Sequence, residues 1–155
     1  MVEIRNILCP VDFSEISSKV ASYAEDIARG LNAVVHVLYV APSIDQYAVL
    51  RIPPTNFQDV VSETIIDAEN TMDTFIKENF SMENVTGKVL SGYTAEMILS
   101  FSEDANIDLI IMGTHGRRGF DRVFFGSVAE KIIKAAKIPV LTIRPDKKEE
   151  AGKVI

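Results

Sequence analysis

Short strand-like segments alternating with longer stretches of helical periodicity constrain the fold of this chain more than any other feature. Residues 4–11 and 33–40 are almost unbroken apolar runs, which are typical of strands buried on both faces of a sheet. Further strand candidates cover 85–90, 108–112 and 140–143. The stretches between them place mostly apolar residues on one helical face, in four groups: Val20, Ala24, Ile27, Ala28 and Leu31; Val61, Ile65, Ala68, Met72, Phe75 and Ile76; Ala95, Ile98, Leu99 and Ser102; and Val128, Ala129, Ile132, Ile133 and Ala136.

Five strands alternating with four helices predict an α/β chain with an open parallel sheet and helices on both faces. The 155 residues show no internal repeat, so we expect one domain over 1–145 and a charged tail over 146–155. We place the end of the first helix at Gly30 and interpret 42–58 as a long loop. Its apolar side chains suit a lid, a subunit contact, or a loop folded back on its own domain.

Charge and cysteine content narrow the class of ligand. The chain has a net charge of −6, which argues against a general nucleic-acid binder. Residues 113–137 nevertheless carry six basic and two acidic side chains, and a locally basic segment in an acidic protein suits a small anion. A single cysteine allows no internal disulfide, and no apolar run approaches the roughly 20 residues that span a bilayer. We therefore expect a cytoplasmic protein with no nucleic-acid or membrane partner.

Residues 112–129, MGTHGRRGFDRVFFGSVA, carry the clearest chemical signal. Gly113 and Gly116 follow a strand candidate, while Gly126 and Ser127 open a helix candidate. Glycine lets a ligand approach the backbone without a Cβ in the way. A helix start offers unpaired N–H groups and a partial positive charge, which together hold an anion. The pattern favours a polyphosphate site, and glycines placed for the turns alone are the structural alternative.

Several other functions fit the sequence less well. The segment contains neither the GxxxxGK(S/T) loop nor the GxGxxG loop of dinucleotide-binding folds. A receiver-like phosphoryl acceptor at Asp12 would need paired acids there, whereas Phe13 follows it. The flavodoxin alternative would need a Ser/Thr/Gly-rich cradle, which residues 10–17 lack. No base, nucleophile and orienting partner mark an enzyme, so we predict no catalytic residue and no protein-held metal site.

Three residues with reactive side chains are interpreted individually. His115 lies between glycines and is interpreted as a hydrogen-bond donor rather than a general acid. His36 lies inside a strand candidate and is expected to be structural. Cys9 lies in the first strand candidate and should behave as a small buried hydrophobe without reactivity.

The spacing Gly-x2-Gly-x9-Gly-Ser resembles the nucleotide loop of the universal stress protein family, in its ATP-binding branch. The resemblance extends to ILCPVDFS near the start, LYVAP after the second strand, DLIIMGTHG before the loop, GSVAEKII after it, and IPVLTIRP at the end. It implies a Rossmann-like sheet in the order 3-2-1-4-5. Strands 1 and 4 then flank the switch point, and Asp12 and Gly113 follow them.

The resemblance also implies a set of binding residues. The adenine should lie against Pro10, Val11, Asp12 and Val40, and the ribose against Met112 and Gly113. The phosphates should lie against His115, Gly116, Arg117, Arg118, Gly126, Ser127 and Val128. Mg²⁺ would be held by the phosphates and by water rather than by a protein cage.

The resulting prediction is a stress or regulatory module that binds ATP, AMP or ADP. A slow ATPase or phosphotransfer enzyme is the alternative. The strand at Val140–Ile143 is a short apolar edge between two prolines, and an exposed edge invites pairing with another chain. Family resemblance implies that it pairs antiparallel across a two-fold axis in a homodimer. The alternative is an edge covered by the protein's own tail.

Overall fold

The computed structural model describes residues 1–48, 57–115 and 126–146. Its elements run in the order expected of an α/β chain, with one helix more than predicted. They are β1 (Asn6–Pro10), α1 (Glu15–Leu31), β2 (Val34–Ala41), α2 (Ile44–Ala48), α3 (Phe57–Asn79), β3 (Val85–Ser91), α4 (Thr94–Asp104), β4 (Leu109–Gly113), α5 (Ser127–Ala135) and β5 (Val140–Ile143). Residues 147–155 of the predicted tail lie outside the described part.

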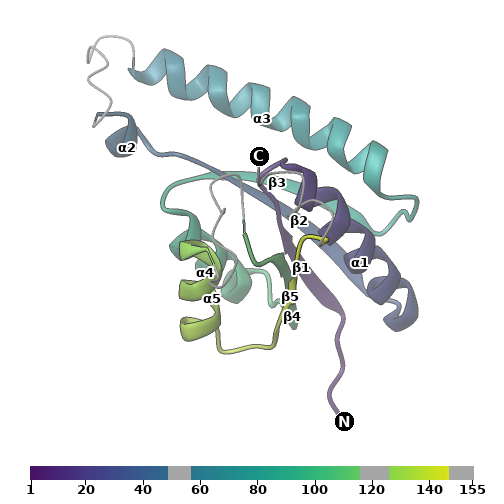
Figure 1. Cartoon of the computed structure of the whole chain (residues 1–155). Coiled ribbons are helices and arrows are strands. Elements are labelled where there is room, and N and C mark those ends of the chain that lie inside the picture. The colour runs from purple at the N-terminus through teal and green to yellow at the C-terminus, as the bar shows by residue number, and fades with distance from the viewer. Residues whose placement is uncertain (49–56, 116–125, 147–155) are drawn as a thin grey trace.

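The strands form a parallel sheet in the order β3-β2-β1-β4-β5, which confirms the predicted fold (Figure 1). The crossovers from β1 to β2 and β3 proceed toward one edge, and those to β4 and β5 proceed toward the other. β1 and β4 are therefore the central neighbours at which the winding reverses. Ligands of such sheets bind beyond the carboxyl ends of these two strands.

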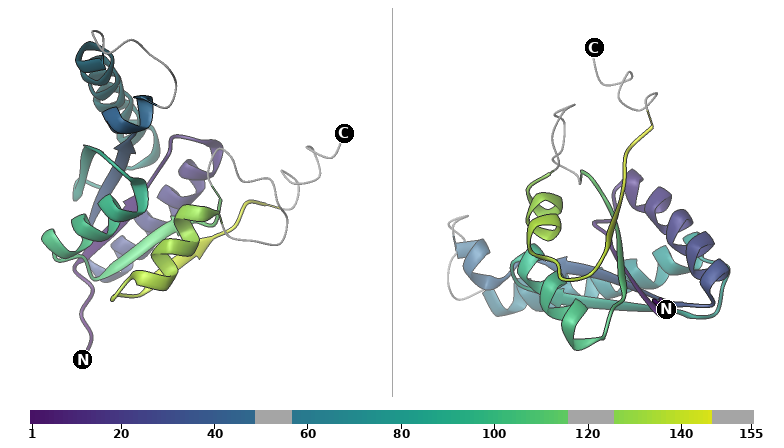
Figure 2. Two further views of the ribbon diagram at one scale, coloured as in Figure 1. Left: turned by 90° about the vertical axis from the view of Figure 1, so that its left-hand side faces the viewer. Right: turned by 90° about the horizontal axis from the view of Figure 1, so that it is seen from below.

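Each face of the sheet has its own apolar core, so the protein has three layers (Figure 2). α1 and α3 cover one face, where Cys9 and Ile111 are fully buried. α4 and α5 cover the other, where Leu8 and Ile110 are fully buried. Burial raises the pKa of Cys9 to about 12, so its thiol stays protonated and inert near neutral pH, as predicted.

Two local predictions about helices were wrong. α1 continues past Gly30 to Leu31, and Asn32 caps it in the left-handed conformation with φ 55° and ψ 42°. Asparagine tolerates this conformation, so the helix did not need the glycine to end. The segment 42–58 is also not all loop, because it contains α2. The Ser43 amide donates to Gln46 Oε1 at 2.7 Å, as in a capping box, and this S-x-x-Q pattern is the signal that sequence reasoning missed.

Candidate functional site

The candidate site begins where the hydrogen-bonded ladder between β1 and β4 stops. Their register pairs only Ile7 with Leu109 and Leu8 with Ile110, whereas the register of β1 with β2 continues to Pro10. The Val11 amide donates to the Leu38 carbonyl on β2 at 2.9 Å, so alternation directs the Pro10 nitrogen toward β4. Proline has no N–H, so Pro10 cannot donate to β4. Pro10 therefore ends the hydrogen-bonded ladder between β1 and β4 at the switch point.

Asp12 follows directly, and its carboxylate is fixed by the start of α1. Asp12 Oδ1 accepts from the Ser14 amide at 3.0 Å, from the Ser17 hydroxyl at 3.0 Å, and from the Ser14 hydroxyl. The Asp12 amide donates in turn to Ser17 Oγ at 3.2 Å. Ser17 is buried, at 3% exposure, so this network holds the Asp12 carboxylate from its buried side. Sequence reasoning missed Ser17, which no short-range pattern distinguishes.

Phe13 makes the turn between Asp12 and α1. Its φ of 61° is in the left-handed region, which is unusual for a bulky residue and costs on the order of 1–2 kcal/mol. Stacking offsets this cost, because the Phe13 ring lies 4.7 Å from the Tyr39 ring and meets Phe75 edge-on at 5.7 Å. Aromatic packing on the α1 face therefore holds the conformation that presents Asp12 at the end of β1.

The apolar residues predicted to contact the adenine and the ribose divide between the two faces of the sheet. Val40 and Met112 are buried in the cluster beneath α4 and α5, at 8% and 5% exposure. Val11 is in the opposite cluster, against α1 and α3. Pro10 is partly buried at the end of β1. The structure thus brings Val40 and Met112 into one apolar cluster, while the Val11 side chain faces away from it.

Two glycines lie close to the backbone at the end of β4 and the start of α5. The Gly126 amide donates to the Thr114 carbonyl at 2.8 Å, and the Thr114 amide donates to the Ile143 carbonyl at 3.0 Å. A Cβ on Gly113 would lie 3.2 Å from the His115 carbonyl oxygen, and one on Gly126 would lie 3.3 Å from the Thr114 oxygen. A side chain at either position would therefore crowd the neighbouring backbone.

The amino terminus of α5 has no capping side chain at its N-cap residue. Gly126 occupies the N-cap and has no side chain with which to cap the helix. The first turn therefore presents its amides, at exposed Ser127 and partly buried Val128, together with the positive end of the helix dipole. Because the Gly126 amide is hydrogen-bonded to the Thr114 carbonyl, this helix start lies against the end of β4. Ser127 is the first helical residue, not the cap itself.

His115 and Thr114 form a pair beneath this helix start. Thr114 Oγ1 lies 2.8 Å from His115 Nδ1, and Thr114 is almost fully buried. Sequence reasoning selected His115 and missed Thr114, whose burial depends on how β4, β5 and α5 meet. Gly116, Arg117 and Arg118 lie outside the described residues, so the basic part of the predicted phosphate side is not described.

His36 has the structural role that was predicted for it. Its Nε2 is 3.1 Å from Asn6 Oδ1, and its Nδ1 is 3.1 Å from Thr86 Oγ1, so it bridges three strands. Burial lowers its pKa below the ordinary value. The ring also meets Phe101 of α4 edge-on at 6.3 Å.

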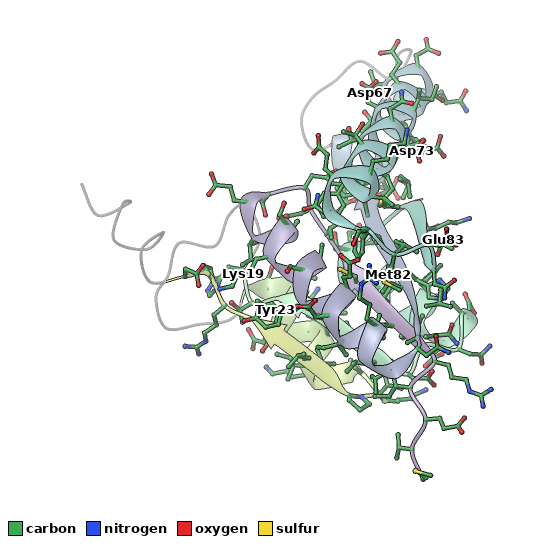
Figure 3. The ribbon with its side chains drawn as sticks, turned by 90° about the vertical axis from the view of Figure 1, so that its right-hand side faces the viewer. Lys19, Tyr23, Asp67, Asp73, Met82 and Glu83 are labelled. Atoms are coloured by element: carbon green, nitrogen blue, oxygen red, sulfur yellow. The ribbon has the colours of Figure 1, made fainter. Side chains whose placement is uncertain are left out.

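A depression of about 430 Å³ lies at the opposite end of the sheet, beside the amino-terminal ends of the strands. Met82 and Glu83, labelled in Figure 3, line it together with the end of α1. Glu25 holds this corner, since its Oε1 accepts from the Ser81 amide at 3.0 Å and from Arg29. Burial acts to raise the pKa of Glu25, but hydrogen bonds from Ser81 and Arg29 outweigh it and keep the pKa below its usual value. These contacts fasten the α3–β3 connection to α1, and no predicted site residue lies there.

Within the described ranges, no group of three or more His, Cys, Asp or Glu side chains is arranged to hold a metal ion. None of the helices in these ranges is long and apolar enough to cross a bilayer.

Comparison with known proteins gives a consistent result. The model of the universal stress protein family matches residues 3–144. Universal stress protein MJ0531 of Methanocaldococcus jannaschii is 33% identical over 148 residues, covering 94% of this chain and 85% of that protein. The solved structure of MJ0577 from the same organism superposes with a TM-score of 0.81 at 26% identity, covering 94% of this chain and 99% of that one.

A third match is to a protein solved with a nucleotide. It is the universal stress protein from Archaeoglobus fulgidus in complex with dAMP, with a TM-score of 0.63 at 21% identity. The match covers 92% of this chain and 99% of that one. At this identity the likeness establishes a shared fold.

Proposed function

Since this chain belongs to the universal stress protein family, we propose that it binds an adenine nucleotide, ATP foremost, as a regulatory ligand. The observation that carries the proposal is the uncapped start of α5, fastened to the end of β4 by the Gly126–Thr114 hydrogen bond. It brings an anion-binding helix terminus to the switch point of the sheet. The dAMP complex of the Archaeoglobus fulgidus relative supports an adenine nucleotide as the occupant.

The base and ribose lie at the ends of β1, β2 and β4 in this proposal. The buried side chains supply an apolar surface, Val40 near the base and Met112 near the ribose, with Pro10 and the Val11 backbone beside the base. Asp12 accepts a hydrogen bond from the ribose or the base, because Ser14 and Ser17 already fix the orientation of its carboxylate. A pocket of this kind combines apolar walls with a few oriented polar groups.

The phosphates lie at the start of α5. Amides of Ser127 and Val128 donate to phosphate oxygens, as does the Ser127 hydroxyl, and Gly113 and Gly126 allow the close approach. Gly116, Arg117 and Arg118, together with His115, complete the phosphate side, and Mg²⁺ is held by the phosphates and water. Each exposed charge–dipole contact contributes only about 0.3–1 kcal/mol, so affinity requires several to converge on one polyphosphate.

ATP acts here as a ligand that sets a conformation, and not as a substrate consumed for its product. Phosphoryl transfer needs a group that orients water or an acceptor in line with the γ-phosphate. Among the described residues near the helix start, His115 is the nearest candidate, and its Nδ1 is engaged by Thr114. A slow ATPase or phosphotransfer enzyme remains the competing function, and a turnover measurement separates the two.

Titration calorimetry with ATP, adenosine and GTP tests the proposal directly. We expect ATP to bind more tightly than adenosine, because phosphate contacts add to those of the base, and GTP to bind weakly. Gly126→Val should abolish ATP binding in a folded protein. Gly30→Val is the matched control, since a Cβ at Gly30 meets nothing within 4 Å. Wild-type affinity for ATP in folded Gly126→Val would refute the site.

We also propose that two copies pair through β5. Leu141 is 38% exposed on this edge strand, and Lys19 Nζ donates to the Arg144 carbonyl at 2.8 Å and to Asp146 at 2.6 Å. Figure 3 shows Lys19 on α1 beside the end of β5. The residues just after β5 are thus hydrogen-bonded to α1 and do not fold back along β5. This supports the proposal that the outer edge of β5 is open to a partner.

The backbone of β5 allows a selective test of this dimer. The amides of Ile110 on β4 and of Thr114 just after it donate to the carbonyls of Pro139 and Ile143. The backbone polar groups of odd-numbered residues therefore face β4, and Thr142 directs its N–H outward. Thr142→Pro removes that outward donor and keeps the β4 ladder, because proline is tolerated on a sheet edge. Light scattering should give a dimer for the wild type and a monomer for the variant. A monomeric wild type at micromolar concentration would contradict the proposal.

A further inference from the structure

One buried polar atom at the candidate site lacks a partner. His115 Nε2 is enclosed and has no hydrogen bond within the described part of the chain. The other ring nitrogen, Nδ1, lies 2.8 Å from Thr114 Oγ1. Buried polar groups in native proteins are nearly always hydrogen-bonded, so an exception calls for an explanation. His115 as a whole is partly exposed, although this ring nitrogen is enclosed.

The pairing with Thr114 decides which nitrogen of neutral His115 carries the proton. If Nδ1 carried it, Nδ1–H would donate to Thr114 Oγ1, and the buried threonine hydroxyl would have no acceptor among the described residues. If Nε2 carries it, the hydroxyl donates to Nδ1, and only the Nε2–H is left unpaired. The second arrangement leaves fewer buried groups unsatisfied and is therefore preferred.

We infer that His115 donates its Nε2–H to a phosphate oxygen of the nucleotide, and that Thr114 is the positioning residue that fixes its tautomer. The inference rests on the proposed nucleotide site and assigns roles within it. Two backbone contacts place the pair at that site, because the Thr114 carbonyl accepts from the Gly126 amide and a Cβ on Gly126 would lie 3.7 Å from His115 Cα. The helix start supplies only donors, so its ligand supplies the acceptor that Nε2–H lacks.

Nitrogen-15 NMR of the imidazole ring tests the tautomer without nucleotide. We expect the Nε2–H form in the free wild type, and a shift of the Nε2 resonance when ATP is added. Thr114→Val keeps the shape of the side chain and removes the hydroxyl, so it should give a mixture of tautomers. Thr114→Ser keeps the hydroxyl and should restore the Nε2–H form. A purely structural role for Thr114 would leave the tautomer unchanged in both variants.

Calorimetry tests the contact with phosphate. His115→Ala should weaken ATP about tenfold, the equivalent of one hydrogen bond to a charged group, and should leave adenosine within about twofold. Thr114→Val should weaken ATP by a smaller factor, and Thr114→Ser should behave as wild type. Wild-type ATP affinity in His115→Ala, or an Nδ1–H tautomer in the free protein, would overturn this inference alone. A wild type that binds adenosine but gains nothing from the phosphates would overturn the proposed function together with it.

Discussion

Replacing Gly126 with aspartate should move stability and ATP affinity in opposite directions. Gly126 occupies the N-cap of α5 with φ −59° and ψ 160°, which any L-residue adopts without strain. Asp at this position caps a helix better than Gly by a few tenths of a kcal/mol, and its charge adds about 0.3–1 kcal/mol against the helix dipole. The new Cβ would lie 3.3 Å from the Thr114 oxygen, so a small shift offsets part of this gain.

The same carboxylate occupies the amides that the phosphates need. Loss of charge-assisted hydrogen bonds costs about 1.5–3 kcal/mol each, and like-charge repulsion at about 4 Å adds roughly 1–4 kcal/mol. We therefore expect ATP affinity to fall by a factor of about 100 or more, with adenosine affinity unchanged. Gly126→Asn is the matched control, because it caps comparably without the charge and should lie between wild type and aspartate.

Thermal unfolding and titration calorimetry measure the two effects separately. The unfolding temperature of ligand-free Gly126→Asp should stay level or rise by up to about 4 °C, while ATP binding is lost. Undiminished ATP binding in the folded aspartate variant would refute the assignment of the phosphates to this helix start. So would an equal loss of ATP and adenosine affinity, because that would indicate a general distortion.

Three further outcomes are expected. Gly87→Ala should destabilise the protein by about 1–3 kcal/mol in urea unfolding, because the new Cβ would lie 2.6 Å from Met72 Cγ. Gly30→Ala should stabilise it by roughly 0.5–1 kcal/mol, because a Cβ there meets nothing within 4 Å and alanine favours the helix. Burial lowers the pKa of His36 in the folded state, so the unfolded chain takes up a proton at higher pH than the folded protein does. The stability that neutral His36 contributes is therefore complete above about pH 6.5, and it falls as the pH drops toward the folded-state pKa. Unfolding free energies at about pH 7.5 and 5.5 should therefore differ less in His36→Gln than in wild type. Phosphate release from ATP and Mg²⁺ should fall orders of magnitude below the roughly 1–1,000 per second of typical enzymes, and turnover near one per second that His115→Ala abolishes would make this protein an enzyme.

Much of the fold could be predicted because its signals are local. Apolar runs marked the strands, and β5 coincided with the predicted residues Val140–Ile143. Glycine spacing drew attention to the end of β4 and the start of α5, where a Cβ on Gly113 or Gly126 would crowd the backbone. Family resemblance supplied the strand order, which periodicity does not encode. Two predictions were wrong because a stronger local signal was preferred. The end of α1 was placed at Gly30 instead of at the Asn32 cap, and the segment 42–58 was interpreted as a loop although it contains the capping box of α2.

The sequence by itself determined the elements, their alternation and the residue types that converge on one end of the sheet. The tertiary structure decided which of those side chains meet. Ser17 reaches Asp12, Thr114 engages His115, and Val11 lies on the opposite face from Val40. These contacts depend on strand register, on the face to which each side chain points, and on where α5 meets β4. Such relations arise between segments far apart in the chain, and local propensity and periodicity carry no record of them.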